Sequence, residues 1–220
     1  MAEYSLVEVV SDQKPNPMIK ARHNQLYIWF FRNFFGILAK IHFRKLIVVS
    51  DVNIRENQSV LLFQNHFSWW DGYWSYHLSW KVLDRRFYVM MFEEQLQKRL
   101  FLNRTGIFSI RRNNRDFLNS LQYSSEILTD PKNLVTIYPA GNMLTQHQQM
   151  IRFQRGIDRI VKGETEHFAI VLAVVLVDYF GFARPEARVY VKNYTEERTV
   201  EAIEKAYHLF YQSCISKQIE

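Results

Sequence analysis

The chain has 220 residues, of which 48% are hydrophobic and 23% are charged. This length suits one α/β domain with an appendage, and the ordinary globular composition excludes disorder as the main state of the chain. A formal net charge of +6 with 15% aromatic residues suits a protein that meets an apolar, anionic partner such as a membrane surface, although a nucleic acid would attract the same charge.

The first residues and the single cysteine indicate where the protein resides. Cys214 is the only cysteine, which excludes an internal disulfide framework and a zinc site built from several cysteines, so we expect a reducing compartment. The first twelve residues carry three acidic side chains and lack the basic start and apolar stretch of a signal peptide. We therefore expect the protein to stay on the cytoplasmic side.

The most apolar stretch of the chain, Leu26 to Phe43, predicts a helix. A membrane-spanning helix needs about twenty residues with few charges, whereas this stretch contains Arg32, Asn33 and Lys40. At helical spacing Arg32, Gly36 and Lys40 form one narrow stripe, and apolar side chains fill the rest of the surface. We expect an amphipathic helix that lies in a membrane interface; the alternative is a helix packed on the core of its own domain.

Short β-branched runs alternate with helical patterns from Lys45 onward. The runs predict strands at Leu46–Val49, Val60–Phe63, Phe87–Met91, Leu134–Tyr138, Phe168–Val177 and Ala187–Val191. Helices are expected at Ser68–Trp80, Glu93–Leu100, Asn113–Leu128 and Thr199–Ser213. This alternation predicts an α/β fold with a mixed, mainly parallel sheet flanked by helices. We expect an N-terminal segment over 1–45, which holds the interfacial helix, and a domain over 46–220.

The sequence NHFSWWDG, residues 65–72, places a histidine and an aspartate five positions apart after a predicted strand. Five residues on an ideal helix are about 140° apart, so His66 and Asp71 cannot meet as helical neighbours. They can meet if His66 lies in the loop and Asp71 in the first helical turn. Ser68 followed by Asp71 resembles a capping box, which would make Asp71 the third helical residue. The alternative is that Asp71 only caps the helix and His66 is an ordinary loop histidine.

A paired histidine and aspartate can perform acyl transfer. A neutral imidazole can accept the proton of a hydroxyl as its oxygen attacks an acyl carbonyl, which contributes about 10² to 10⁴ in rate. The aspartate fixes the tautomer and stabilises the imidazolium that forms. No Gly-x-Ser-x-Gly sequence is present, so a serine acyl-enzyme has no nucleophile elbow and direct transfer to the acceptor is simpler.

At these residues the chain resembles the glycerol-phosphate and lysophosphatidate acyltransferases, whose signature is His-x-x-x-x-Asp followed by ordered blocks. His66 and Asp71 match the first block, with His66 as general base oriented by Asp71. The second block, a glycine, a short apolar strand and an arginine, matches Gly106 to Arg112. The resemblance implies that Gly106 and Arg112 belong to the substrate site and that Arg112 contacts an anionic head group. The alternative is that Arg112 is an ordinary solvated arginine on the surface.

The third block of the family reads aromatic, Pro, Glu, Gly, and here it is Tyr138, Pro139, Ala140 and Gly141. Ala140 replaces the family carboxylate, and Met143 replaces a basic residue that often follows the glycine. A substitution that disarms the enzyme and a natural branch with another acceptor both explain these departures. By the resemblance these four residues and Asn65 contact substrate, although Pro139 and Gly141 also suit a plain turn. Further on, Phe153 to Gly156 resembles the aromatic, basic, glycine stretch of the family.

The resemblance covers roughly Ile47 to Val191 and implies transfer of an acyl group from acyl-CoA or acyl carrier protein to a hydroxyl of a lipid or lipid-like acceptor. The acceptor can be a glycerophosphate, an aminolipid or an aryl alcohol. We expect no metal and no cofactor beyond the thioester co-substrate, and a peripheral or monotopic location at the cytoplasmic face of the inner (plasma) membrane. A catalytically silent lipid-binding protein of the same fold is the alternative. A nucleic-acid partner is not expected, because no motif with interleaved basic residues is present.

Overall fold

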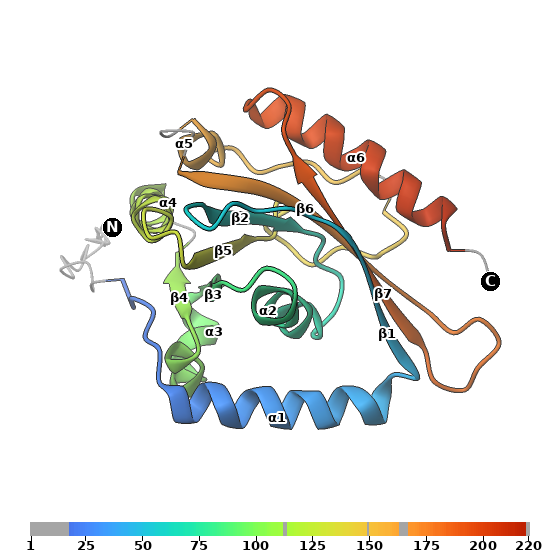
Figure 1. Ribbon diagram of the computed structural model, residues 1–220. Helices are drawn as coiled ribbons and strands as arrows, with labels where there is room; N and C mark the ends of the chain where they lie inside the picture. Colours follow the sequence, from blue (N-terminus) through green and yellow to red (C-terminus); the bar gives the residue numbers. More distant parts are fainter. Residues whose placement is uncertain (1–17, 112–113, 149, 163–166, 219–220) are drawn as a thin grey trace, which may run out of the picture.

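The computed structural model describes residues 18–111, 114–148, 150–162 and 167–218, and one seven-stranded sheet organises them (Figure 1). Neighbouring strands are parallel except for the β6–β7 pair, which is antiparallel. The prediction of a mixed, mainly parallel sheet is therefore confirmed. The strand order is β1 (Lys45–Asp51), β7 (Glu186–Tyr194), β6 (Phe168–Asp178), β2 (Ser59–Gln64), β5 (Asn133–Ile137), β3 (Arg86–Phe92) and β4 (Ile107–Ile110).

Strand β2 lies at the centre of the sheet, and all six of its residues are buried. Successive side chains of a strand point to opposite faces, so Leu61 and Phe63 belong to one apolar cluster and Val60 and Leu62 to the other. Helices cover both faces, as a buried parallel sheet requires. In Figure 1 α4 (Asn114–Ile127), α5 (Asp158–Val161) and α6 (Val200–Ser216) lie on one side, and α1 (Gln25–His42) and α2 (Asp71–Lys81) lie on the other.

The expected helices are present with shifted boundaries. The helix expected from Ser68 begins at Asp71, because residues 68–70 form a turn before it. The stretch Glu93–Leu100 divides into a short α3 (Glu93–Gln97) and a 3-10 helix, η1 (Leu100–Arg104). The short α5 has no counterpart among the predictions. The proposed division at residue 45 stays a prediction, since β1 begins there without a separate packing unit to test it.

Helix α1 begins where the Asn24 side chain accepts hydrogen bonds from the backbone N–H groups of Leu26 and Tyr27. The predicted polar stripe is turned mostly toward the protein: the Arg32 guanidinium lies 4.8 Å from the centre of the Trp80 ring, and Gly36 faces the Tyr73 hydroxyl. The opposite face is apolar and exposed, through Leu26, Trp29, Phe30, Phe34, Ile37 and Ile41. Among the described helices none is both long enough and apolar enough to cross a bilayer.

The place of Gly106 in the substrate site stays a prediction, but the structure shows a backbone role for this residue. Its φ of +100° lies in a region that L side chains rarely adopt, and a Cβ built there would lie 2.0 Å from the carbonyl oxygen of Phe87. Its N–H donates to the carbonyl of Arg22, which holds the chain before α1 against the start of β4. The need for close backbone approach explains the glycine without a ligand.

Substitution of Gly106 should therefore destabilise the fold. We expect Gly106→Ala to lower the free energy of unfolding by about 3 kcal/mol, through positive-φ strain and the clash with Phe87. Gly72→Ala is the matched control, because a methyl group there meets nothing within 4 Å, and we expect it to be neutral or slightly stabilising. Denaturant unfolding of both variants checks this; equal stability of the two would contradict the backbone role.

Candidate active site

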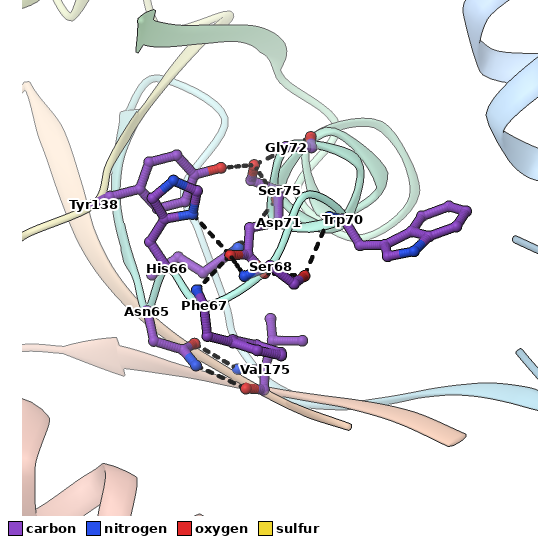
Figure 2. Close-up of polar contacts among 11 residues, drawn as sticks. Asn65, His66, Phe67, Ser68, Trp70, Asp71, Gly72, Ser75, Tyr138 and Val175 are labelled. Carbon is purple, nitrogen blue, oxygen red and sulfur yellow. Dashed lines mark hydrogen bonds and ion pairs between the residues drawn. The ribbon is translucent and has the colours of Figure 1, made fainter. Parts of the chain in front are cut away.

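His66 and Asp71 come together where β2 ends and α2 begins. The His66 Nδ1 atom lies 2.7 Å from Asp71 Oδ2, as the spacing argument required (Figure 2). The Asp71 side chain is fully buried, whereas a quarter of the His66 side chain is exposed. A carboxylate can only accept, so Nδ1 carries the proton and Nε2 is left with a lone pair. The arrangement pairs a partly exposed imidazole with a buried carboxylate.

The Asp71 carboxylate also shapes the loop that carries His66. The backbone N–H groups of Phe67 and Ser68 donate to Oδ2 at 2.6 and 2.7 Å, and the Ser68 hydroxyl lies 3.1 Å from Oδ1. Ser68 Oγ in turn accepts from the N–H of Trp70. Ser68 and Asp71 interact, as a capping box predicts. The predicted helical position is wrong, because Asp71 is the first residue of α2 and not the third. The carboxylate folds back over the loop to reach these donors.

Tyr138 forms one wall of the site. Its ring stacks on the His66 imidazole with centroids 4.3 Å apart and planes 18° from parallel, and its hydroxyl lies 3.1 Å from Ser75 Oγ (Figure 2). Burial, and then the nearby Asp71 charge, raise the pKa of Tyr138, so the phenol stays protonated. The resemblance placed Tyr138 among substrate contacts; the structure places it against the catalytic candidate, where it holds the ring plane.

Asn65 lines a small hollow together with His66, and its expected contact with substrate stays a prediction. Its amide donates to the carbonyl of Val175 at 2.7 Å and accepts from the N–H of Val175 at 2.8 Å, and the residue is buried. Both ends of the amide are thus used to tie the end of β2 to β6. Gln64 acts similarly, because its side chain donates to the Asp71 carbonyl and holds the start of α2. These two residues position the loop from behind.

The segment after β5 is a turn that lies beside His66. Gly141 adopts a φ of +68° and its N–H donates to the Tyr138 carbonyl, which accounts for the glycine as a turn residue. The Gln154 side chain donates to the Ala140 carbonyl. Pro139 and Ala140 line a small hollow together with His66, and Ala140 also lines a larger one. Pro139 and Ala140 of the third block therefore border the hollow at His66, and their contact with substrate stays a prediction.

The larger hollow, of about 390 Å³, shares Ala140 and Leu144 with the small hollow at His66. Arg152 is the cation in its lining and is exposed, and no described residue forms a hydrogen bond or ion pair with it. Sequence reasoning missed Arg152, although it directly precedes the Phe153 to Gly156 stretch. Arg112, the expected head-group contact, lies outside the described residues. Its neighbour Arg111 forms a two-pronged ion pair with Glu93, with both contacts at 2.7 Å.

No trio of histidine, cysteine, aspartate or glutamate within the described ranges is placed to hold a metal ion. The groups gathered at the end of β2 are an imidazole, a carboxylate, a phenol and two serine hydroxyls. Such a set can accept a proton at His66 and stabilise the resulting cation through Asp71. The chemistry that it supports is therefore general base catalysis.

Comparisons with known proteins agree with this architecture. The family model described as Acyltransferase matches residues 45–175, which include His66, Asp71 and the third block. A solved structure from Thermotoga maritima, titled as that of the 1-acyl-sn-glycerophosphate (LPA) acyltransferase PlsC, is similar with a TM-score of 0.60 and 12% identity, over 87% of this chain and 79% of that chain. At this identity the likeness concerns the fold. A comparison with curated proteins finds no match.

The stacking of Tyr138 on His66 generates a test. We expect Tyr138→Leu to let the imidazole reorient, so that NMR of its ring nitrogens shows mixed tautomers, and to lower unfolding free energy by about 1–2 kcal/mol. Tyr138→Phe keeps the stacked ring and loses only the contact with Ser75, so it should retain the Nδ1-protonated tautomer. A leucine variant with the tautomer of the parent protein would show that the stack does not position His66.

Proposed function

The chain belongs to the acyltransferase family, and from this premise we propose that it transfers an acyl group from a thioester to a hydroxyl of a lipid or lipid-like acceptor at a membrane surface. The observation that carries the proposal is the His66–Asp71 pair, in which the carboxylate is buried and the imidazole is partly exposed and lines a small hollow. The donor is acyl-CoA or acyl carrier protein; the excess of basic residues suits both, since both are anionic.

The proposed reaction is direct transfer. His66 Nε2 takes the proton of the acceptor hydroxyl while the oxygen attacks the thioester carbonyl. The new C–O bond forms, the C–S bond breaks, and the thiolate that leaves takes the proton from the imidazolium. Asp71 stabilises the positive charge on His66 between these two proton transfers. Tyr138 and the hydrogen bonds of Ser68 hold the His66 ring and the Asp71 carboxylate in place throughout.

We propose that the acceptor binds in the larger hollow. The solved relative from Thermotoga maritima is titled as acting on a lysophosphatidate, which supports a lipid acceptor here. The hollow adjoins the small hollow at His66 and offers the Arg152 guanidinium, which no described residue pairs and which suits an anionic group on the acceptor. Ala140 in its lining replaces the family's carboxylate, and Met143 replaces the basic residue that often follows the glycine. An acceptor other than a glycerophosphate, such as an aminolipid or an aryl alcohol, therefore remains within the proposal.

Membrane association is proposed through α1. Its exposed face carries large apolar side chains, with Trp29 58% and Ile37 62% exposed, and the polar Arg32 is turned inward. A helix of this kind lies in the interface with its apolar face among the lipids. Phe35 of α1 packs on Trp69 of the His66 loop at 5.6 Å between centroids, so the docked helix would bring the site close to the lipid. We propose the cytoplasmic face of the inner membrane, in keeping with the single cysteine.

The catalytic proposal predicts that His66→Ala lowers acylation roughly 10² to 10⁴-fold, because the general base is lost. The protein is incubated with mixed acyl thioesters and vesicles of a total lipid extract, and mass spectrometry identifies the species that gains an acyl group. His147→Ala is the control, since His147 is an exposed loop histidine and should leave the rate unchanged. If His66→Ala kept full activity, or the biological role persisted without acylation, the lipid-binding alternative would replace the proposal.

The acceptor proposal predicts that Arg152→Gln raises KM for an anionic acceptor about 10-fold with little change in kcat, because a head-group contact is made equally in the ground and transition states. Arg155→Gln is the matched control, because Arg155 is also exposed and lies outside the described lining of the hollow. Steady-state kinetics with the acceptor found by mass spectrometry measure both. If the two substitutions raised KM equally, Arg152 would act only through general surface charge and not through a contact with the acceptor.

A further inference from the structure

The turn between β6 and β7 exposes aromatic side chains that the fold does not use. Tyr179 is 57% exposed and Phe182 is 44% exposed. The tip is formed by Phe180 and Gly181, with φ of +42° and +77°, and is closed by a hydrogen bond from Phe182 N–H to the Tyr179 carbonyl. Tight hairpin turns favour asparagine or glycine at such positions, so a phenylalanine there is held against backbone preference. These aromatic side chains belong to neither apolar cluster of the core, and the turn geometry does not require them.

Arginine side chains lie over two of these rings. The Arg44 guanidinium is 3.6 Å from the centre of the Phe182 ring, and that of Arg188 is 4.3 Å from the centre of the Phe180 ring. Both arginines pair with the buried Glu186. Residues 40–45 and 178–188 together hold five lysines and arginines against two carboxylates, Asp178 and Glu186, so the region keeps a positive excess. Aromatic rings among cations are the composition that binds the head-group layer of an anionic bilayer.

The hairpin is attached to the end of α1. Arg184 Nη1 donates to the carbonyls of Lys40 and Ile41 at 3.0 and 3.3 Å, and so satisfies two carbonyls of the last helical turn. Figure 1 shows the hairpin beyond the C-terminal end of α1. Ile41, one of these residues, is itself 60% exposed on the apolar face of the helix. The C-terminal end of the apolar face of α1 therefore lies next to the hairpin.

We propose that the β6–β7 hairpin, residues 179–185, is a second membrane contact that binds the head-group region of an anionic bilayer. The inference rests on the proposed docking of α1 and adds a function that α1 alone cannot supply. A single interfacial helix leaves the protein free to tilt, with one end of the helix lifted from the bilayer. A second contact beyond the C-terminal end of α1 limits this tilt, and with it the angle at which the His66 loop meets the lipid.

Co-sedimentation of the protein with vesicles of phosphatidylcholine, with and without phosphatidylglycerol, tests the proposal. We expect the double substitution Tyr179→Ser and Phe182→Ser to lower partitioning onto the anionic vesicles about 10-fold. Leu209→Ser is the matched control, because Leu209 on α6 is 60% exposed and lies away from this surface, and it should bind as the parent does. Unchanged partitioning of the hairpin variant overturns the proposal.

Further measurements separate this inference from the proposals on which it rests. If Ile37→Ser with Ile41→Ser abolishes vesicle binding while the hairpin variant binds fully, docking by α1 stands and the hairpin contact fails. If neither variant alters binding, both fail. If the hairpin variant loses vesicle binding but the parent protein acylates no lipid, the contact stands and the proposed enzymatic function fails.

A label at the hairpin gives a readout that leaves the aromatics intact. Cys214 is the only cysteine and is buried, so Ala183→Cys offers one accessible thiol for an environment-sensitive fluorophore. We expect its emission to shift to the blue and gain intensity on anionic vesicles. The same label at Lys205→Cys on α6 should not respond. Protein that sediments with vesicles while the Ala183 label keeps its aqueous emission would contradict the contact.

Discussion

The hydrogen bond between His66 and Asp71 is the interaction on which the site depends. One carboxylate oxygen accepts from the imidazole and from two backbone N–H groups of the same loop, so the group that orients the base also fixes the path of the chain that carries it. Removal of that charge would free the loop as well as the ring. The Asp71 carboxylate can be buried and desolvated because charge-assisted hydrogen bonds surround it.

Local patterns in the sequence were sufficient for much of the fold. Apolar runs located most of the strands, and the five-residue spacing of His66 and Asp71 indicated a loop-to-helix junction, because no regular helix lets such residues meet. The family membership that followed from the ordered blocks is confirmed. Boundaries were less accurate where a side chain, as at Asp71, folds back and competes with the backbone for donors.

Contacts between segments distant in sequence could not be predicted from the sequence. Asn65 pairs with Val175, 110 residues away, because β6 lies beside β2, and nothing near Asn65 reveals that strand order. Tyr138 reaches His66 for the same reason, since β5 is the other neighbour of β2. The periodicity of α1 separated a polar stripe from an apolar surface but could not show that Trp80 would draw Arg32 inward. Helical spacing defines faces; tertiary structure decides which face is covered.

Because β2 and β5 run parallel, their carboxyl ends deliver His66 and Tyr138 to the same edge of the sheet, while residues 139–148 and 150–156 lie beside that edge outside the strands. The loop is held down by side chains such as Gln146, Gln154 and Glu204 bonding to backbone groups. In the proposed reaction this loop would contact the acceptor, whereas the edge of the sheet would hold the proposed base. Changes in the loop, such as the alanine and methionine at positions 140 and 143, would then alter the choice of acceptor without displacing His66.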